Sequence, residues 1–394
     1  MSGPLADVLV VDLSRALAGP HATMMLGDLG ARVIKVETPD SGDDTRGYGP
    51  PFVGVGDARE STYFLAANRN KESVALDLKD AGDREVLLAL VDRADVLVEN
   101  FRTGVLDRLG LGIDALMARN PRLVVLSITG FGHDGPEGGR AGYDQIAQGE
   151  GGLMSLTGSG PDDPQRVGVP IADLLAGMNG AYGVVAALHE RHRTGVGVVV
   201  RTSLLASVVG VHAFQGTRWT VAGEVGRAQG NHHPSIAPYG LFRCRDGAVQ
   251  IALGSESLWR RFCIVFGLDP DAQGLATNAE RVEARPRLIT VVEHAFAEWD
   301  AGPLLERLSG AGLPAGRVRT IDEVYDWDQT VSQGLQIEVD HSTLGPITLP
   351  GPPLRFFGAD GQEVAGHDHA PPPTLDQHGD GIRAWVVGEA RGSA

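Results

Sequence analysis

The stretch that decides the fold spans residues 140–193. It reads R-A-G-Y-D-Q-I-A-Q-G-E-G-G-L-M-S-L-T-G from 140 to 158 and, after a polar loop, V-G-V-P-I-A-D-L-L-A-G-M-N-G-A-Y-G-V-V-A-A-L-H-E-R-H-R from 167 to 193. Apolar residues recur at helical spacing in the second part, which predicts one long helix from Ile171 to Arg193. Asp173 lies in its first turn, where free backbone N–H groups favour negative charge. Alone, this position suits either an ordinary first-turn acid or a nucleophile beside a glycine-rich surface.

Strands and helices alternate along the chain around this stretch. The predicted strands span residues 8–13, 32–37, 73–78, 95–99, 123–128 and 196–201, and predicted helices span residues 20–29, 81–93, 113–119 and 202–214. This alternation predicts an α/β fold with a Rossmann-like large domain, in which a mostly parallel sheet is covered on both faces. The first strand–helix turn, S-R-A-L-A-G-P-H from 14 to 21, lacks the G-x-G-x-x-G of a dinucleotide site. We therefore expect no nicotinamide cofactor.

The character of the chain changes near residue 226. Two strands followed by clustered helices predict a smaller α+β domain over residues 226–318. Residues 1–225 then form the N-terminal part of the large domain, and residues 319–394 form a C-terminal segment rich in proline and glycine. The glycine-rich loop Gly230–Pro234, near the start of the smaller domain, is interpreted as a gate over a ligand pocket.

The charge balance restricts the partners. The 394 residues include 34 Lys plus Arg against 50 Asp plus Glu, a net charge of −16. Such an excess of acid repels nucleic acid and anionic lipid, so we expect neither as a partner. No apolar run approaches the roughly 18 residues of a membrane span. The sequence has two cysteines, Cys244 and Cys263, and we expect both to be free thiols. So few cysteines are typical of a protein in the reducing cytoplasm, where we expect this one to be.

Three histidines invite functional readings. His232 and His233 are adjacent, but no third ligand stands at metal-binding spacing, so we expect no metal site. His133 lies in the turn G-H-D-G-P, a setting that predicts a solvated loop histidine rather than a catalytic base.

Several segments, taken in order and spacing, resemble the class III CoA-transferase family, the group of formyl-CoA transferase and carnitine CoA-transferase. They run from about residue 5 to about residue 215, with weaker matches beyond, and are G-P-x-A-T-M-M-L-G-D-L-G-A-R-V-I-K-V-E (19–37), N-R-N-K-E-S-V-A-L-D-L (68–78), D-V-L-V-E-N-F-R-T-G-V-L-D-R-L-G (95–110), S-I-T-G-F-G (127–132), A-G-Y-D (141–144) and P-I-A-D-L-L-A-G (170–177). The resemblance implies an interlocked homodimer in which the C-terminal segment returns to the large domain. It also implies an acyl-CoA and a small carboxylic acid as substrates, with coenzyme A held as a substrate and no tightly bound cofactor.

The resemblance also implies roles for individual residues. Asp173 matches the nucleophile that forms an aspartyl-CoA thioester, and Asp144 matches an acid beside it. Residues that match CoA contacts are Leu17, Leu76, Asn100, Arg108 and Tyr143. On physical grounds alone we add Arg46, Lys71, Arg102 and Arg140, because the CoA phosphates need cations that the net charge does not provide. We expect Asp173 to be ionised at neutral pH, since the reference pKa of an aspartate is about 4.

Two departures and two alternatives accompany this interpretation. Thr38 stands where many relatives place an arginine near the adenine nucleotide, and the loop Gly230–Pro234 replaces a run of glycines in the formyl-CoA transferases, which argues against oxalate and formate specificity. One alternative is an α-methylacyl-CoA racemase-type isomerase, whose histidine would fall at Tyr143. A phenol with a reference pKa of about 10 is a poor base at neutral pH. The other alternative is a non-enzymatic acyl-CoA-binding protein.

Overall fold

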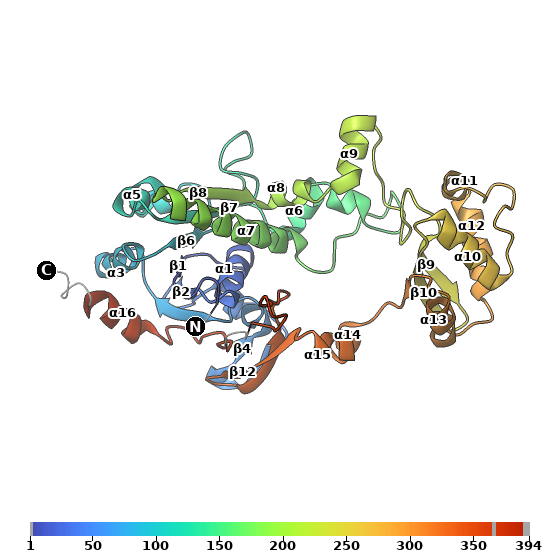
Figure 1. Cartoon of the computed structure of the whole chain (residues 1–394). Coiled ribbons are helices and arrows are strands. Elements are labelled where there is room, and N and C mark those ends of the chain that lie inside the picture. Colours follow the sequence, from blue (N-terminus) through green and yellow to red (C-terminus); the bar gives the residue numbers. More distant parts are fainter. Residues whose placement is uncertain (1–2, 365–367, 389–394) are drawn as a thin grey trace. The chain divides into compact units, whose positions relative to one another are not determined.

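The computed structural model describes residues 3–364 and 368–388. Within these residues the chain forms two compact units, which can be followed in Figure 1. The first unit contains the described residues up to 153, residues 167–222 and the described residues from 328 onward. The second unit contains residues 154–166 and 223–327. The domain bounds expected at residues 226 and 318 stay a prediction.

A six-stranded sheet forms the centre of the first unit, and all its neighbouring strands pair in parallel. The strand order is β5 (Lys71–Ala75), β2 (Arg32–Glu37), β1 (Leu9–Asp12), β6 (Val96–Glu99), β7 (Val124–Thr129) and β8 (Val199–Ser203). The winding direction reverses between β1 and β6, and in such sheets ligands bind off the carboxyl ends of the strands near that point. The predicted α/β fold with a mostly parallel sheet is confirmed.

Both faces of the sheet are buried because successive strand residues point to opposite sides. Val10 packs into one apolar core, and the next residue, Val11, packs into another. The first core is covered by α1 (Ala18–Asp28), α6 (Asp144–Glu150), α7 (Ile171–Thr194) and α8 (Leu204–Gly210). The second is covered by α3 (Ala81–Val91), α4 (Val105–Arg108), α5 (Ile113–Arg119) and α16 (Gly379–Gly388).

The long helix α7 extends from Ile171 to Thr194, one residue beyond the predicted end. It stops at Gly195, whose φ of 76° lies in the left-handed region that glycine adopts readily. Close packing explains one of its internal glycines: a Cβ on Gly177 would lie 2.7 Å from the carbonyl oxygen of Ala18 in α1. Small residues therefore let α7 approach α1 closely.

By length and composition alone α7 is apolar enough to cross a membrane, so the expectation that no such run exists is wrong. This finding is weak evidence for a membrane span, because core helices of soluble proteins have the same character. Ala176, Gly180 and Val184 of α7 are buried within the first core or against it. Gly180 approaches β7 closely, since a Cβ there would lie 2.8 Å from a methyl group of Leu126.

The helix predicted over residues 202–214 is instead two helices with a break. Ser203 ends β8, and its hydroxyl caps α8 by accepting a hydrogen bond from the N–H of Ala206 at 3.0 Å. The helix α8 ends at Gly210, Val211 and His212 are not helical, and α9 then spans Ala213–Ala222. Ala213 has a positive φ of 47°, which interrupts the helix although the apolar pattern continues.

The C-terminal segment lies along β5, the edge strand of the sheet. The N–H of Asn70 donates to the carbonyl oxygen of Ala370 at 2.9 Å, and the N–H of His378 donates to that of Ser73 at 3.0 Å. The remaining elements of this unit are the hairpins β3–β4 (Phe52–Val53, Glu60–Ser61) and β12–β13 (Gln336–His341, Gly345–Pro350), the short 3-10 helices η1 (Asp44–Gly47), η2 (Gly56–Ala58) and η3 (Leu153–Leu156, at the boundary between the units), and the helices α2 (Thr62–Leu65) and α15 (Asp328–Ser332).

The second unit has its own small sheet and core. Its antiparallel strands are β9 (Tyr239–Cys244), β10 (Gly247–Ala252) and β11 (Ala315–Gly316), and its helices are α10 (Glu256–Phe266), α11 (Asn278–Glu283), α12 (Arg285–Phe296), α13 (Ala301–Gly310) and α14 (Ile321–Tyr325). In its core the ring of Trp259 stacks on that of Phe262, and Phe296 meets Phe262 edge-to-face. Cys244 and Cys263 are free thiols, as predicted.

Candidate active site

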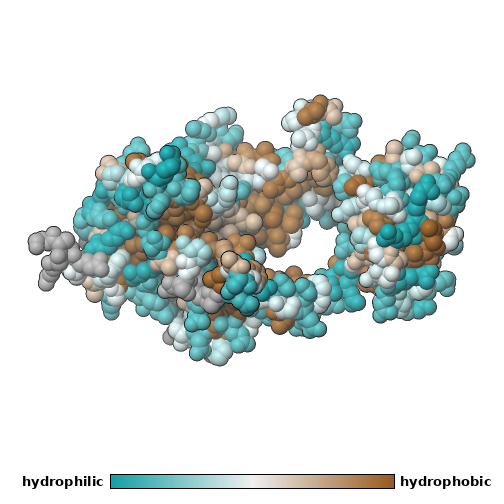
Figure 2. All heavy atoms as spheres, in the orientation of Figure 1, coloured by the Kyte–Doolittle hydropathy of each residue, from teal (hydrophilic) through white to brown (hydrophobic). Residues whose placement is uncertain are grey.

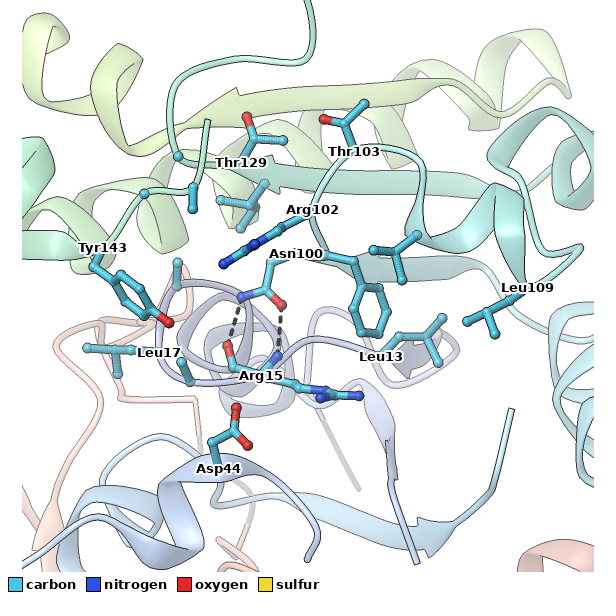
Figure 3. Close-up of a pocket in the computed structure, with 18 of the residues that line it drawn as sticks. Leu13, Arg15, Leu17, Asp44, Asn100, Arg102, Thr103, Leu109, Thr129 and Tyr143 are labelled. Carbon is cyan, nitrogen blue, oxygen red and sulfur yellow. Dashed lines mark hydrogen bonds between the residues drawn. The ribbon is translucent and has the colours of Figure 1, made fainter. Parts of the chain in front are cut away.

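A cavity of about 600 Å³ opens at the carboxyl ends of the strands in the first unit. It is lined by residues that directly follow or end β1, β5, β6 and β7, among them Leu13, Leu76, Asn100 and Thr129 (Figure 3). All of its lining residues belong to the first unit. The volume falls within the roughly 300–1,000 Å³ of typical ligand pockets, and the location is the one that the strand order predicts.

Asp173 lines this cavity from the first turn of α7. Its side chain is partly buried, and its neighbour Asp144 carries the same charge. Burial first and the charge of Asp144 second raise the pKa of Asp173 to about 7. The expectation of a fully ionised carboxylate at neutral pH is therefore wrong, because the reference value ignores both effects.

Asp144 starts α6 and reaches the start of α7. Its Oδ1 accepts a hydrogen bond from the N–H of Ala172 at 2.8 Å, and its Oδ2 accepts one from Nε2 of Gln148, also at 2.8 Å. Pro170, the N-cap residue of α7, provides no side-chain cap. Asp144 thus satisfies a free N–H at the end of a helix to which it does not belong.

Seven of the nine predicted CoA-binding residues line the cavity: Leu17, Leu76, Asn100, Arg102, Arg108, Arg140 and Tyr143. Tyr143 is 68% exposed, and Figure 3 shows its ring reaching toward Leu17. Arg140 is already engaged: it forms ion pairs with Glu150 at 2.6 Å and Glu137 at 3.4 Å.

The amide of Asn100 holds the turn between β1 and α1. Its Oδ1 accepts the N–H of Arg15 at 2.8 Å, and its Nδ2 donates to the carbonyl oxygen of Arg15 at 2.7 Å, the two dashed bonds in Figure 3. The next residue, Ala16, has a φ of 62°, a left-handed conformation that costs energy for alanine. Asp43 accepts the N–H of Ala16 at 3.2 Å and itself pairs with the buried Lys35. Side chains from three segments therefore fix a strained cavity wall.

Arg46 and Lys71 do not line the cavity, so their interpretation as phosphate ligands is corrected. The guanidinium of Arg46 pairs with Glu37 at 2.7 Å and lies 3.7 Å from the ring centre of Phe64. The ammonium of Lys71 is buried and donates to Asp12 at 3.0 Å as well as to two other oxygens. Burial lowers its pKa to about 8 despite the attraction of Asp12. Both cations neutralise acids inside the fold.

Sequence reasoning missed two cations of the cavity wall, Arg15 and Lys79. Together with Arg102 and Arg108 they form no ion pair with any residue that the structure describes. Arg15 lies against the ring of Phe101, 5.3 Å from its centre. Their positions after strands could have predicted them, because Arg15 lies beyond the carboxyl end of β1 and Lys79 lies beyond that of β5. Four unpaired cations in a chain of net charge −16 favour an anionic ligand.

His133 is not a solvated loop histidine, so that expectation is wrong. Its Nε2 lies 2.7 Å from the hydroxyl of Ser127, which also contacts the buried Glu99. Burial and the nearby Arg201 lower the pKa of His133. This group ties the loop after β7 to β6, and none of its three members lines the cavity.

Comparisons with known proteins agree with this geometry. Residues 5–379 match the model of CoA-transferase family III. The chain is 39% identical over 377 residues to the succinyl-CoA:glutarate CoA-transferase of Mus musculus, covering 95% of this chain and 84% of that protein. It is 37% identical over 388 residues to the acetyl-CoA:oxalate CoA-transferase of Acetobacter aceti, covering 97% and 95%. The crystal structure of a CAIB/BAIF family protein from Brucella suis matches with a TM-score of 0.86 at 38% identity, covering 98% and 100%.

Proposed function

Because this chain belongs to CoA-transferase family III, we propose that it moves CoA from an acyl-CoA thioester to a free carboxylic acid through a covalent intermediate on Asp173. The observation that carries the proposal is the position of Asp173 in the wall of a cavity that also presents Arg15, Lys79, Arg102 and Arg108. These cations suit the phosphates of CoA. Asp173 suits the reacting end, since a carboxylate is a competent nucleophile toward a thioester.

The chemistry exchanges one activated acyl group for another. A carboxylate oxygen of Asp173 attacks the donor thioester carbon, and the C–S bond breaks to give a mixed anhydride and CoA thiolate. The thiolate then attacks the aspartyl carbonyl carbon, which releases the donor acid and leaves an aspartyl-CoA thioester. The acceptor carboxylate repeats these steps in reverse. Every nucleophile and every leaving group is an anion, so no step requires a proton transfer.

The acid substrates are proposed from the relatives. One relative is named for succinyl-CoA and glutarate, and another is named for acetyl-CoA and oxalate. We take small dicarboxylic acids as the first acceptors to test. The protein is proposed to work in the cytoplasm, without a nucleic-acid or membrane partner, with CoA entering only as a substrate.

An exchange assay tests the reaction class. The protein is incubated with labelled succinyl-CoA and a panel of free acids in D₂O. Passage of CoA to another acid indicates transfer. Deuterium at the α-carbon without transfer would favour the racemase-type isomerase, for which Tyr143 is the unfavourable residue. Binding of acyl-CoA with neither change would leave only a binding protein.

A covalent trap tests the role of Asp173. With acyl-CoA present, hydroxylamine should convert residue 173 to a hydroxamate and borohydride should reduce it, and both products change the mass of one peptide. Asp173→Asn should lower transfer by about 10⁴-fold or more, since an amide cannot form the anhydride. Asp162→Asn, at an exposed acid in the loop before α7, serves as the matched control. Wild-type exchange in Asp173→Asn, or modification at another carboxylate only, would contradict the proposal.

A further inference from the structure

Gly130 and Gly142, which flank the loop formed by residues 131–141, contact each other through their backbones. A Cβ on Gly130 would lie 2.5 Å from both the Cα and the N of Gly142, and a Cβ on Gly142 would lie 2.5 Å from the Cα of Gly130. Neither glycine has a positive φ, so the requirement is steric and not conformational. Because backbone atoms meet here, no side-chain rotation can make room for a larger residue.

This contact fixes the segment that carries Asp144. Gly130 follows β7, and its carbonyl oxygen accepts the N–H of Leu205 in α8 at 3.0 Å. Gly130 is therefore tied to the sheet and to α8. Gly142, pressed against it, is only two residues before Asp144. The closeness of the two glycines thus sets where α6 begins.

From α6 the contacts continue to the nucleophile. Asp144 accepts the N–H of Ala172, the residue before Asp173, at 2.8 Å. Its other oxygen is held by the buried Gln148, whose own Oε1 accepts the N–H of Val167 at 2.9 Å. Asp144 and Gln148 therefore anchor both the first turn of α7 and the loop that leads into it.

We propose that Asp144 is a positioning residue, held in place by the Gly130–Gly142 contact, which sets the first turn of α7 and so the position of Asp173. This inference rests on the proposed nucleophilic role of Asp173. An acid or base role for Asp144 is disfavoured by chemistry, since the proposed steps transfer no proton. It is also disfavoured by geometry, because both carboxylate oxygens already accept hydrogen bonds within the protein. Errors of about 1 Å in the placement of a reacting group can cost about 100-fold in rate.

Two substitutions of Asp144 distinguish positioning from acid–base chemistry. Asp144→Ala removes the acceptor of the Ala172 N–H, so kcat should fall by about 100-fold while KM for succinyl-CoA changes by less than about threefold. Asp144→Asn keeps an oxygen for that N–H and loses the bond to Gln148, so kcat should stay within about tenfold of wild type. It also removes a negative charge beside Asp173, and the acid limb of the pH–rate profile should move to lower pH. A proton-transfer role would instead make the two variants equally inactive.

A substitution at Gly142 tests whether the contact between the two glycines helps to position Asp144. Gly142→Ala should reduce kcat by at least about 30-fold, again with little change in KM. Gly254→Ala, in the second unit, is the matched control, because a Cβ there would meet no atom within 4 Å and the φ of Gly254 is not positive. Should Gly142→Ala fail to fold, the Asp144 pair still decides the inference. Wild-type kcat in Asp144→Ala, or an inactive Asp144→Asn, would overturn the inference. If Asp173→Asn is inactive in the same assay, such a result would leave the proposed function intact.

Discussion

At the level of single residues, the raised pKa of Asp173 predicts the pH dependence of the enzyme. In the proposed mechanism only the ionised carboxylate attacks the thioester. Burial, together with the charge of Asp144, raises the pKa of Asp173 to about 7. We therefore expect kcat/KM to rise with pH and to reach half its plateau near pH 7. The measurement is kcat/KM for succinyl-CoA between about pH 5 and pH 9. A profile that stays flat down to about pH 5 would mean that the carboxyl is solvated, with an ordinary pKa.

The same carboxyl destabilises the fold when it is charged. Its ordinary pKa of 3.8 applies to the unfolded chain, and the folded value is about 7. The stability that the protonated group contributes is thus complete below about pH 4 and is lost as the pH rises through 7. Asp173→Asn removes this loss, so it should increase the free energy of unfolding at about pH 8 by on the order of 2 kcal/mol. Denaturant unfolding at about pH 8 and about pH 4 checks this, since the gain should vanish in acid.

Residue charge alone predicts a binding role poorly. Lys71 and Arg46 read as free cations in the sequence, whereas the fold brings each to an acid, Asp12 and Glu37 respectively. Asp12 is 59 positions from Lys71, and no periodicity reports such a pairing. Position after a strand was the better guide, because it holds for Asn100 and would have found Arg15 and Lys79.

At the level of elements, the periodicity of apolar residues predicted the bounds of helices and strands correctly where a residue that ends the element follows. β2 and α5 have the predicted bounds, and α7 differs by one residue because Gly195 ends it. The break after α8 was missed, since Val208 to Phe214 stay mostly apolar while Ala213 takes a left-handed conformation. Such a break depends on tertiary contacts and not on local pattern.

The C-terminal segment gives a testable case of a left-handed residue. Asp376 has a φ of 58°, in the left-handed region that favours glycine. Its Oδ1 accepts the N–H of Ala75 at 2.7 Å, which offsets the backbone strain. Asp376→Ala keeps the strain and loses the bond, so we expect a loss of about 2 kcal/mol in unfolding free energy. Asp376→Gly loses the bond and the strain together, and should stay within about 1 kcal/mol of wild type.

Thermal unfolding of the two variants side by side makes this comparison. The Ala variant should have the lower Tm of the pair. Equal losses in both would show that the hydrogen bond to Ala75 matters and the backbone conformation does not. The Ala variant should also have a higher KM for acyl-CoA, because Leu76 of the cavity wall directly follows the strand that Asp376 holds and Lys79 lies three residues further on.

At the level of the whole molecule, we predict a homodimer that persists at nanomolar concentration. Figure 2 shows apolar side chains gathered over α7 and α8. The exposed large apolar residues of α7, α8 and the following α9 include Met178, Tyr182, Val185, Val209, Phe214 and Trp219. Tyr182 is 77% exposed although it lies on a core helix. A soluble protein rarely leaves so large an apolar surface uncovered, so a second copy of the chain is its expected partner.

Sedimentation velocity at nanomolar protein measures the assembly. Tyr182→Glu should shift the population toward monomer, because it buries a charge in the expected interface. Ile264→Glu is the matched control, since Ile264 is 78% exposed on α10, a helix of the second unit. A monomeric wild-type protein would contradict the prediction outright.

The coverage of β5 by the C-terminal segment also affects how the chain is made. The outward N–H groups of Ser73 and Ala75 donate to the side chains of His378 and Asp376, so side chains satisfy the edge N–H groups that a neighbouring strand would otherwise pair with. An uncovered edge invites pairing with other chains and aggregation. During synthesis this edge stays uncovered until residues some 300 positions after β5 have been added to the chain. A chain that has not yet reached residues 376–378 is therefore expected to be more prone to aggregation through β5 than the finished chain.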